Sequence, residues 1–214
     1  MKSIVVWGAG GHARVVAQTL HRLRSWEILG FLDDVDAHRA GEPFAGATVL
    51  GGHEILPALR ERGLTSLALG FGDNRARLER WAGLQRQGFE FPVLIDPHAL
   101  VAEDAVIGEG SYIAAGAIVQ PGVRIGAQVI VNTGAVVDHD CVVEDGVHIG
   151  PRACLCGHVS VGRGAWIGAG SVVRDRARIG EGAYVGIGAL VLSGIADGML
   201  AYGHPAQAIR PVDA

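Results

Sequence analysis

Long apolar runs, basic charge and aromatic side chains are all scarce in this chain of 214 residues. No apolar stretch approaches the roughly 18 residues that a membrane-spanning helix needs, and the first residues run into an expected strand instead of a signal peptide. A formal net charge of −4 gives no basic surface for nucleic acid or acidic membranes. These absences predict a cytoplasmic protein without nucleic-acid or membrane partners.

Cysteine is also scarce, and the three residues Cys141, Cys154 and Cys156 cannot all pair with one another. A free thiol packs like a small hydrophobic side chain, so we expect all three to be reduced. Cys154, Cys156 and His158 alternate with the period of a strand, a pattern that is compatible with a metal site. An ordinary strand with small polar residues is the favoured interpretation.

Glycine and aliphatic residues dominate the second half of the chain and follow a strict six-residue period. A small side chain lies two residues before each aliphatic position. A period of six is neither that of a helix nor that of a flat strand, so it predicts a parallel β-helix that turns a corner every six residues. The sixteen consecutive aliphatic positions are Val101, Ile107, Ile113, Val119, Ile125, Val131, Val137, Val143, Ile149, Leu155, Val161, Ile167, Val173, Ile179, Val185 and Val191.

The same pattern predicts the geometry of each coil. Three hexapeptides form a triangular coil in which the aliphatic residue fills an inner face and the small residue fits an inner corner. Glycine follows seven of the aliphatic residues, and we expect it to relieve backbone strain at the turn. Stacked coils pair at about 4.8 Å, so five coils form a rigid prism about 24 Å tall.

Before residue 97 the pattern changes to alternating strands and helices. Apolar runs predict strands over residues 2–8, 27–34 and 65–72, and helical spacing predicts a helix over residues 13–23. A second helix is expected from about Asn74 to Gln87, with Asp73 as its N-cap. We therefore expect a nucleotide-binding α/β domain over residues 1–97, the β-helix over 98–192 and an extension over 193–214.

The turn GAGGHA at residues 8–13 has the form of a dinucleotide-binding fingerprint, and Asp33 follows about twenty residues later. By itself this motif favours a nicotinamide-dependent enzyme only weakly, because His12 and Arg14 are unusual beside a pyrophosphate. A basic residue at a helix N-terminus is better suited to a phosphate or a sugar phosphate. Alternatively, the glycines only permit a tight turn from strand to helix.

A family resemblance is carried by five segments, which in chain order are GAGGHARVV, FLDD, GDNRAR, the hexapeptide array with NTGAVVDHDCVVEDGVHIG, and GHPAQAIR. Together they resemble the sialic-acid and bacillosamine acetyltransferase family of bacterial sugar acyltransferases, over nearly the whole chain. The resemblance implies a Rossmann-like domain that holds a nucleotide sugar. It also implies a left-handed β-helix that forms a homotrimer and binds acetyl-CoA between subunits; the left hand comes from the family, because the period does not fix it.

The resemblance further implies catalytic residues. His139 matches the family's general base, and Asp140 follows it where the family often has a glutamate that orients the ring. Asn132 and His148 match the family's other polar site positions. A histidine with a pKa near 6.5 is suited to remove a proton from a sugar amine, and a thioester is activated enough that no enzyme nucleophile is needed.

Binding residues follow from the same resemblance, with acetyl-CoA as co-substrate and no metal. The positions that match coenzyme A contacts are Gly157, Ala169, Gly186 and Ile187. The positions that match the nucleotide-sugar pocket are Gly10, Gly11, His12, Asp33, Asp34 and Asn74. The acceptor stays open, because relatives use UDP-linked and GDP-linked amino sugars or sialic acid, and N-transfer and O-transfer need the same base.

The histidine spacing predicts how the site is assembled. His139 and His158 fall on one corner in successive coils, whereas His148 projects outward from another face, either as a site residue or as a surface residue. His148 should lie far from His139 within one subunit. If both serve one site, a neighbouring subunit must complete it.

Three other classes of function remain. His139 and His158, with His148 of a neighbouring subunit, could bind zinc as in carbonic anhydrases that resemble this β-helix, although such an enzyme needs no nucleotide-binding domain. A non-catalytic solenoid would need neither His139 nor the GHPAQ segment. A nicotinamide-dependent enzyme is disfavoured by His12 and by a β-helix that offers no hydride chemistry.

Overall fold

An open five-stranded sheet forms the centre of the N-terminal domain in the computed structural model, which describes residues 1–212. The strand order is β3-β4-β2-β1-β5, and all neighbours are parallel except β3 and β4. The strands are β1 (Lys2–Trp7), β2 (Trp26–Leu32), β3 (Pro43–Phe44), β4 (Ala47–Gly51) and β5 (Leu67–Leu69). The expected α/β arrangement is therefore present.

The helices of this domain are α1 (Gly11–Leu23), α2 (Leu56–Glu61) and α3 (Asn74–Arg86), with single 3₁₀ turns η1 (Ala37–Arg39) and η2 (His53–Ile55). The predicted start of α3 is confirmed, because the Asp73 carboxylate accepts a hydrogen bond from the backbone N–H of Ala76 at 2.8 Å. Within residues 1–212, no helix combines the length and the apolar character required to cross a lipid bilayer.

The glycine turn between β1 and α1 is forced by close packing. Gly8 has a φ of 122°, and a Cβ on it would lie 2.9 Å from the carbonyl oxygen of Gly70 at the end of β5. Only glycine satisfies both conditions. This part of the GAGGHA motif is therefore explained by the turn itself, as the alternative interpretation proposed.

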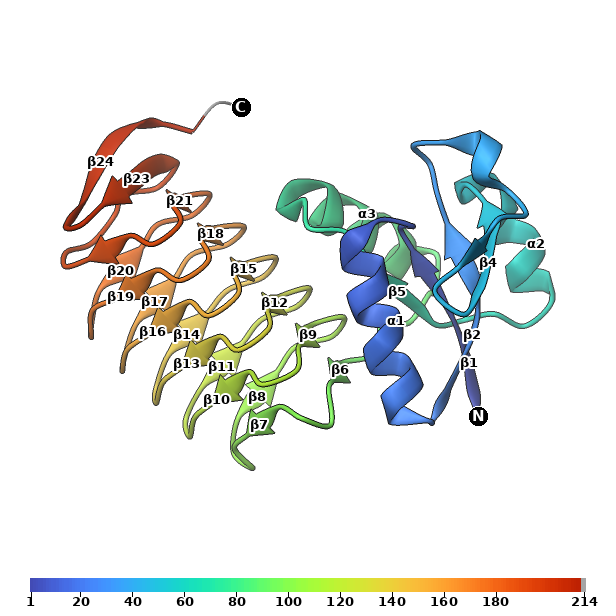
Figure 1. Cartoon of the computed structure of the whole chain (residues 1–214), viewed down its shortest axis with the longest axis horizontal. Helices are drawn as coiled ribbons and strands as arrows, with labels where there is room; N and C mark the ends of the chain where they lie inside the picture. The colour runs from blue at the N-terminus through green and yellow to red at the C-terminus, as the bar shows by residue number, and fades with distance from the viewer. Residues whose placement is uncertain (213–214) are drawn as a thin grey trace.

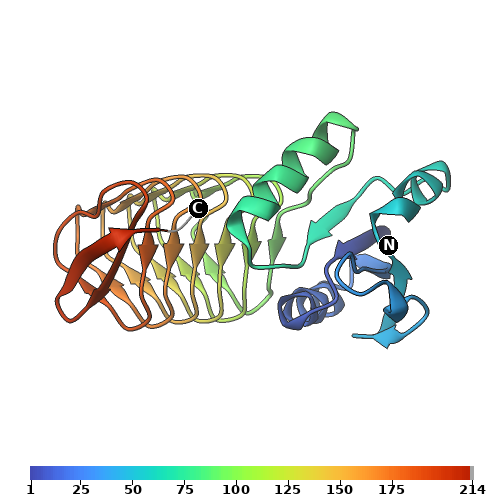
Figure 2. The same ribbon diagram turned by 90° about the horizontal axis from the view of Figure 1, so that it is seen from above.

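The second part of the molecule is a triangular prism of stacked coils (Figures 1 and 2). From Leu94 to Val191, stacked strands pair in parallel at a separation of 18 residues, as Ile118 pairs with Val136, which confirms the coil of three hexapeptides. The inward aliphatic and small residues form one continuous buried core from Ile113 to Ala201. Figure 1 shows α1 and α3 on the side of the N-terminal domain that faces this prism.

Three sheets form the faces of the prism, and we name each by its first strand. The β6 sheet contains β6 (Leu94–Ile95), β9 (Tyr112–Ile113), β12 (Ile130–Val131), β15 (His148–Ile149), β18 (Trp166–Ile167), β21 (Tyr184–Val185), β23 (Met199–Gly203) and the antiparallel β24 (Ala206–Pro211). The β7 sheet contains β7 (Leu100–Val101), β10 (Ile118–Val119), β13 (Val136–Val137), β16 (Cys154–Leu155), β19 (Val172–Val173) and β22 (Leu190–Val191). The β8 sheet contains β8 (Val106–Ile107), β11 (Arg124–Ile125), β14 (Val142–Val143), β17 (Ser160–Val161) and β20 (Arg178–Ile179).

Both ends of the prism extend beyond the expected β-helix range of 98–192. β6 already pairs with β9, so the boundary expected at residue 97 falls inside the first coil. At the other end, β23 pairs in parallel with β21 and then turns back as β24. The hairpin of β23 and β24 thus covers the last complete coil.

The glycine that follows an aliphatic position has a different role from the expected one. Left-handed backbone occurs three residues after the aliphatic position, for example at Gly146 with a φ of 68° and at Asp140 with a φ of 59°. Gly150 directly follows Ile149 without such a φ, and a Cβ on it would lie 2.7 Å from the backbone nitrogen of Ala169 in the next coil. The expectation of strain relief at this position was wrong, because close stacking of coils excludes a side chain there.

Candidate active site

A cavity of about 520 Å³ lies at the carboxyl ends of β1, β2 and β5, where open α/β sheets bind ligands. Five of the six residues expected at a nucleotide-sugar pocket line it, namely Gly10, Gly11, His12, Asp33 and Asp34. They come from the turn before α1 and from the end of β2, two segments that the parallel strand order places side by side. Their role in binding stays a prediction.

Two arginines that the sequence pattern did not predict also line this cavity. Arg39 donates hydrogen bonds to the Asp33 carboxylate at 2.7 Å and to the carbonyl oxygen of Ala9 at 3.0 Å. Arg80 donates to the Asp34 carboxylate at 2.9 Å, and its guanidinium lies 4.6 Å from the ring centroid of Trp7. No spacing rule links these arginines to the aspartates, because they come from η1 and α3.

Asn74, the sixth expected residue, does not line the cavity. Its Nδ2 donates to the carbonyl oxygens of Gly164 and Ala165, each at 3.0 Å, and its Oδ1 accepts from Arg77. The position at the start of α3 turns the side chain toward the prism instead of the pocket. The expectation for Asn74 is therefore corrected: it fixes the N-terminal domain to the β-helix.

His148 lies on the outer surface of the β6 sheet, as expected, but the N-terminal domain covers it. Its exposed fraction is 5%, and its ring centroid lies 4.1 Å from that of Trp166 and 6.3 Å from that of His12. Asn132 donates to Nε2 of His148 over 3.1 Å. The interpretation of His148 as an exposed surface residue is therefore wrong.

Burial keeps two of these rings neutral. Desolvation, aided by the nearby Arg77 cation, lowers the pKa of His148 to about 3. The same two causes lower the pKa of His12 to about 4. His12 lines the cavity, whereas His148 lies behind it against Trp166.

His139 lies at an exposed corner between the β7 and β8 sheets. Its Nδ1 donates to Oδ2 of Asp140 at 2.9 Å, and this hydrogen bond is the main reason why the pKa of His139 is raised. A Cβ on Gly157 would lie 2.6 Å from Nε2 of His139, so glycine leaves room for the ring. The structure thus brings His139, Asp140 and Gly157 together.

The remaining predicted residues lie at another corner of the same prism. Asn132, Ala169, Gly186 and Ile187 belong to the corner between the β6 and β7 sheets. Ala169 and Ile187 are stacked in successive coils, and Ile187 is 79% exposed. One subunit therefore does not bring these residues to His139, because both corners belong to one rigid prism.

The burial of His148 also argues against the zinc site expected as an alternative. A zinc site made by His139, His158 and the His148 of a neighbouring subunit requires an accessible His148. The ring is instead enclosed between the β6 sheet and its own N-terminal domain. His148 cannot reach a neighbouring corner without separation of the two domains, so this three-histidine site is excluded.

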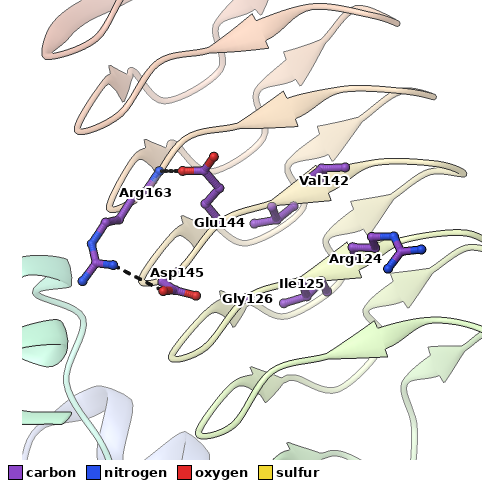
Figure 3. Close-up of a pocket in the computed structure, with 8 residues that line it drawn as sticks. Arg124, Ile125, Gly126, Val142, Glu144, Asp145 and Arg163 are labelled. Carbon is purple, nitrogen blue, oxygen red and sulfur yellow. Dashed lines mark hydrogen bonds and ion pairs between the residues drawn. The ribbon is translucent and has the colours of Figure 1, made fainter. Parts of the chain in front are cut away.

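A second cavity, of about 340 Å³, lies on the β8 sheet and does not involve the predicted residues. Figure 3 shows its charged residues, of which Arg163 pairs with Asp145 at 3.3 Å through its guanidinium and with Glu144 at 2.9 Å through its backbone N–H. Three of its four charged residues are thus engaged with one another. We do not regard it as the active site.

Comparison with known proteins finds relatives of the whole chain. Residues 3–82 match the family model of the PglD N-terminal domain. The curated UDP-N-acetylbacillosamine N-acetyltransferase of Bacillus subtilis (strain 168) is 38% identical over 119 residues, which cover 54% of this chain and 52% of that protein. The matched segment thus spans about half the length of this curated relative.

Two solved structures are similar along almost their full length. A histidine-to-asparagine variant of perosamine N-acetyltransferase from Caulobacter crescentus, in complex with CoA and GDP-perosamine, is 35% identical over 98% of both chains, with a TM-score of 0.93. The acetyltransferase domain of PglB from Neisseria gonorrhoeae FA1090, in complex with acetyl coenzyme A, is 38% identical over 97% of this chain and 99% of that chain, with a TM-score of 0.91. This chain belongs to the hexapeptide-repeat sugar N-acetyltransferases.

Membership of the hexapeptide-repeat sugar N-acetyltransferases confirms the predicted fold class, a Rossmann-like α/β domain followed by a left-handed parallel β-helix. The named relatives are acetyltransferases, which argues against a non-catalytic solenoid and against a nicotinamide-dependent enzyme. The family resemblance inferred from the five sequence segments is thereby confirmed.

Proposed function

We propose that this chain transfers the acetyl group of acetyl-CoA to the amine of a nucleotide-linked amino sugar. The observation that carries this proposal is the likeness, over 98% of both chains, to a perosamine N-acetyltransferase that holds CoA and GDP-perosamine. The imidazole of His139, which is hydrogen-bonded to Asp140, is the base that such a transfer needs.

The proposed mechanism is a direct transfer. The amine nitrogen attacks the thioester carbonyl carbon while His139 accepts the amine proton on Nε2, since Nδ1 is engaged by Asp140. The tetrahedral intermediate then expels the coenzyme A thiolate, which takes up the proton from His139. Asp140 stabilises the imidazolium that forms between these steps and fixes the ring.

The cavity of the N-terminal domain is proposed to hold the acceptor. Gly10 and Gly11 present backbone N–H groups at the start of α1, where a phosphate is favoured. His12 lines the cavity with a ring that burial keeps neutral, so we propose that it contacts the sugar without adding a charge. The aspartates and their arginine partners also line this cavity.

A homotrimer is part of the proposal. The coenzyme A positions are divided between two corners of one prism, with Gly157 beside His139 and with Ala169, Gly186 and Ile187 at the other corner. Two subunits that place these corners together would complete one site, and three such contacts close a ring. Charged substrates do not cross membranes unaided, so we also propose that the enzyme acts in the cytoplasm, where acetyl-CoA is available.

The test is a ligand panel on the full chain. Acetyl-CoA, UDP-linked and GDP-linked 4-amino sugars and CMP-sialic acid are added separately, and thermal unfolding is followed; a ligand at 100 times its Kd stabilises by about 2.7 kcal/mol. Acetyl transfer is then measured as release of the coenzyme A thiol. We expect acetyl-CoA and one nucleotide-linked amino sugar to stabilise the protein and react. Stabilisation and O-acetylation with sialic acid alone would contradict the proposed acceptor class.

A further inference from the structure

His139 and Asp140 share their corner with a third ligand-type side chain, His158, that the proposed mechanism does not use. Nε2 of His158 lies 3.7 Å from the same Asp140 oxygen that accepts the bond from His139. The two imidazole rings meet edge to face with centroids 5.1 Å apart. One ligand atom from each of the three residues lies within 4.8 Å of the others.

The coil geometry explains why these groups meet. Asp140 and His158 are 18 residues apart and occupy the same left-handed corner position, with φ values of 59° and 58°. The N–H of His158 donates to the carbonyl oxygen of His139 at 2.9 Å, which fixes the rise between the coils. Gly157 has no side chain, so the ring of His139 lies over its backbone and reaches His158. The cluster therefore rests on a rigid backbone.

The chemistry of the cluster is that of a zinc site with an open position. Two imidazoles and one carboxylate are a common three-ligand set for zinc, with water as the fourth ligand. The side chains of His139 and Asp140 are each 52% exposed and that of His158 is 44% exposed, so an ion can enter from solvent. The charge of the nearby Arg176 opposes a cation at this cluster, whereas that of Asp138 favours one.

We propose that His139, Asp140 and His158 bind a zinc ion that inhibits the enzyme. Zinc binding follows from the cluster itself, whereas inhibition rests on the proposed role of His139 as the base. Metal on one ring nitrogen of a neutral histidine leaves the proton on the other nitrogen. A zinc-bound His139 therefore cannot accept the proton of the acceptor amine.

His158 makes the proposal testable, because it belongs to the zinc site but not to the proposed catalytic residues. The replacement His158→Asn removes the imidazole and suits the left-handed backbone, which asparagine tolerates better than most residues. His158→Gly is a second variant that tolerates the same backbone without any side chain. As a matched control, His53→Ala disrupts the other cluster of ligand-type residues found within residues 1–212, which is formed by Asp34, His53 and Glu54.

The experiment titrates chelator-treated full-length protein with Zn²⁺ in competition with a fluorescent zinc indicator. We expect one site per chain, a loss of affinity of at least about tenfold in both His158 variants, and unchanged affinity in His53→Ala. Co²⁺ as a spectroscopic probe should give absorption of nitrogen and oxygen ligands without the charge-transfer band of a thiolate. That band would instead assign the metal to Cys154 or Cys156.

Acetyl transfer is measured in parallel. We expect zinc to inhibit the parent enzyme, the His158 variants to keep the zinc-free rate, and zinc to inhibit them only at a concentration at least about tenfold higher. The proposal is overturned by absence of stoichiometric zinc binding, by parental affinity in both His158 variants, or by loss of the site in His53→Ala alone. Zinc binding at His158 in a protein without acetyl transfer would instead contradict the proposed function and leave the metal site intact.

Discussion

Nε of Arg77 lies 2.9 Å from the carbonyl oxygen of Gln128, so a buried cation of α3 is bound to a corner of the β-helix. The same guanidinium donates to the carbonyl oxygen of Gly146, and the neighbouring Asn74 donates to that of Gly164. These three corner residues are 18 residues apart in the chain, so the first turn of α3 contacts three successive coils. This contact positions the acceptor cavity relative to the prism.

Replacement of Arg77 by methionine should destabilise the protein. Methionine fills part of the same volume but leaves the carbonyl oxygens of Gln128 and Gly146 without a donor, at about 1–3 kcal/mol each. We expect a loss of about 2–6 kcal/mol in the free energy of unfolding by urea. Arg75→Met is the matched control on the same helix, because Arg75 is exposed and pairs with the surface residue Glu79, which is also exposed. Equal effects of the two variants would contradict the docking role.

Asp140→Asn should change the pH dependence of acetyl transfer. The hydrogen bond to Asp140 is the main reason why the pKa of His139 is raised, with Asp138 as a smaller contribution and Arg176 as an opposing one. A base acts when neutral, so activity falls as the pH falls through this pKa. We expect the acidic limb of kcat/KM to move to lower pH in Asp140→Asn, with a reduced maximum. An NMR titration of His139 checks the direction, and an unchanged limb would remove Asp140 from the mechanism.

Mixed oligomers should test whether two subunits form one site. His139→Ala should lower kcat by about 10² to 10⁴ and leave acetyl-CoA affinity nearly unchanged. Asn132→Ala changes the corner between the β6 and β7 sheets, which carries the other predicted site residues. If each site takes His139 from one subunit and Asn132 from another, Asn132→Ala should also lower activity, and co-refolded chains of the two variants should be more active than either variant alone. Light scattering that finds an active monomer would contradict this arrangement.

Asp34→Ala should affect the acceptor and not acetyl-CoA. Asp34 lines the cavity and accepts a hydrogen bond from Arg80 at 2.9 Å. The substitution therefore removes the carboxylate and leaves the Arg80 guanidinium without this partner. We expect KM for the acceptor to rise by a factor that corresponds to about 1–3 kcal/mol, with KM for acetyl-CoA unchanged. The backbone N–H of His53 also loses its acceptor, so circular dichroism must first show a folded variant. If the parent protein binds NAD and Asp34→Ala binds it more weakly, the cavity is a dinucleotide site instead.

Asp96 should make stability depend on pH in the acidic range. Desolvation raises its pKa, but hydrogen bonds from Thr19, the backbone N–H of His98 and Arg22 outweigh it and lower the pKa to about 2. The contribution, about 2 kcal/mol, is present above the ordinary pKa near 4 and is lost as the pH falls through about 2. We expect Asp96→Asn to be less stable than the parent at pH 7, with the difference shrinking near pH 2. A difference that is independent of pH would contradict this assignment.

Much of the fold follows from the sequence because the relevant contacts recur at fixed separations. Residues of the regular coils contact residues 18 positions away, so the six-residue period alone identifies buried residues such as Val137 and Ile149. The start of α3 follows from Asp73, whose capping bond joins residues only three apart. His139 and Asp140 are adjacent in the chain, which makes their hydrogen bond a local event.

The packing of the N-terminal domain against the prism was decided only by the tertiary structure. It buries His148, turns Asn74 away from the cavity and places Arg77 against two coils, and none of these contacts has a period in the sequence. The pairing of Arg39 and Arg80 with the aspartates of β2 likewise joins side chains from separate elements. The sequence determined the two folds and the location of the cavity, because hydrophobic periodicity and strand order are local properties. The relative position of the folds depends on complementary surfaces that no local pattern records.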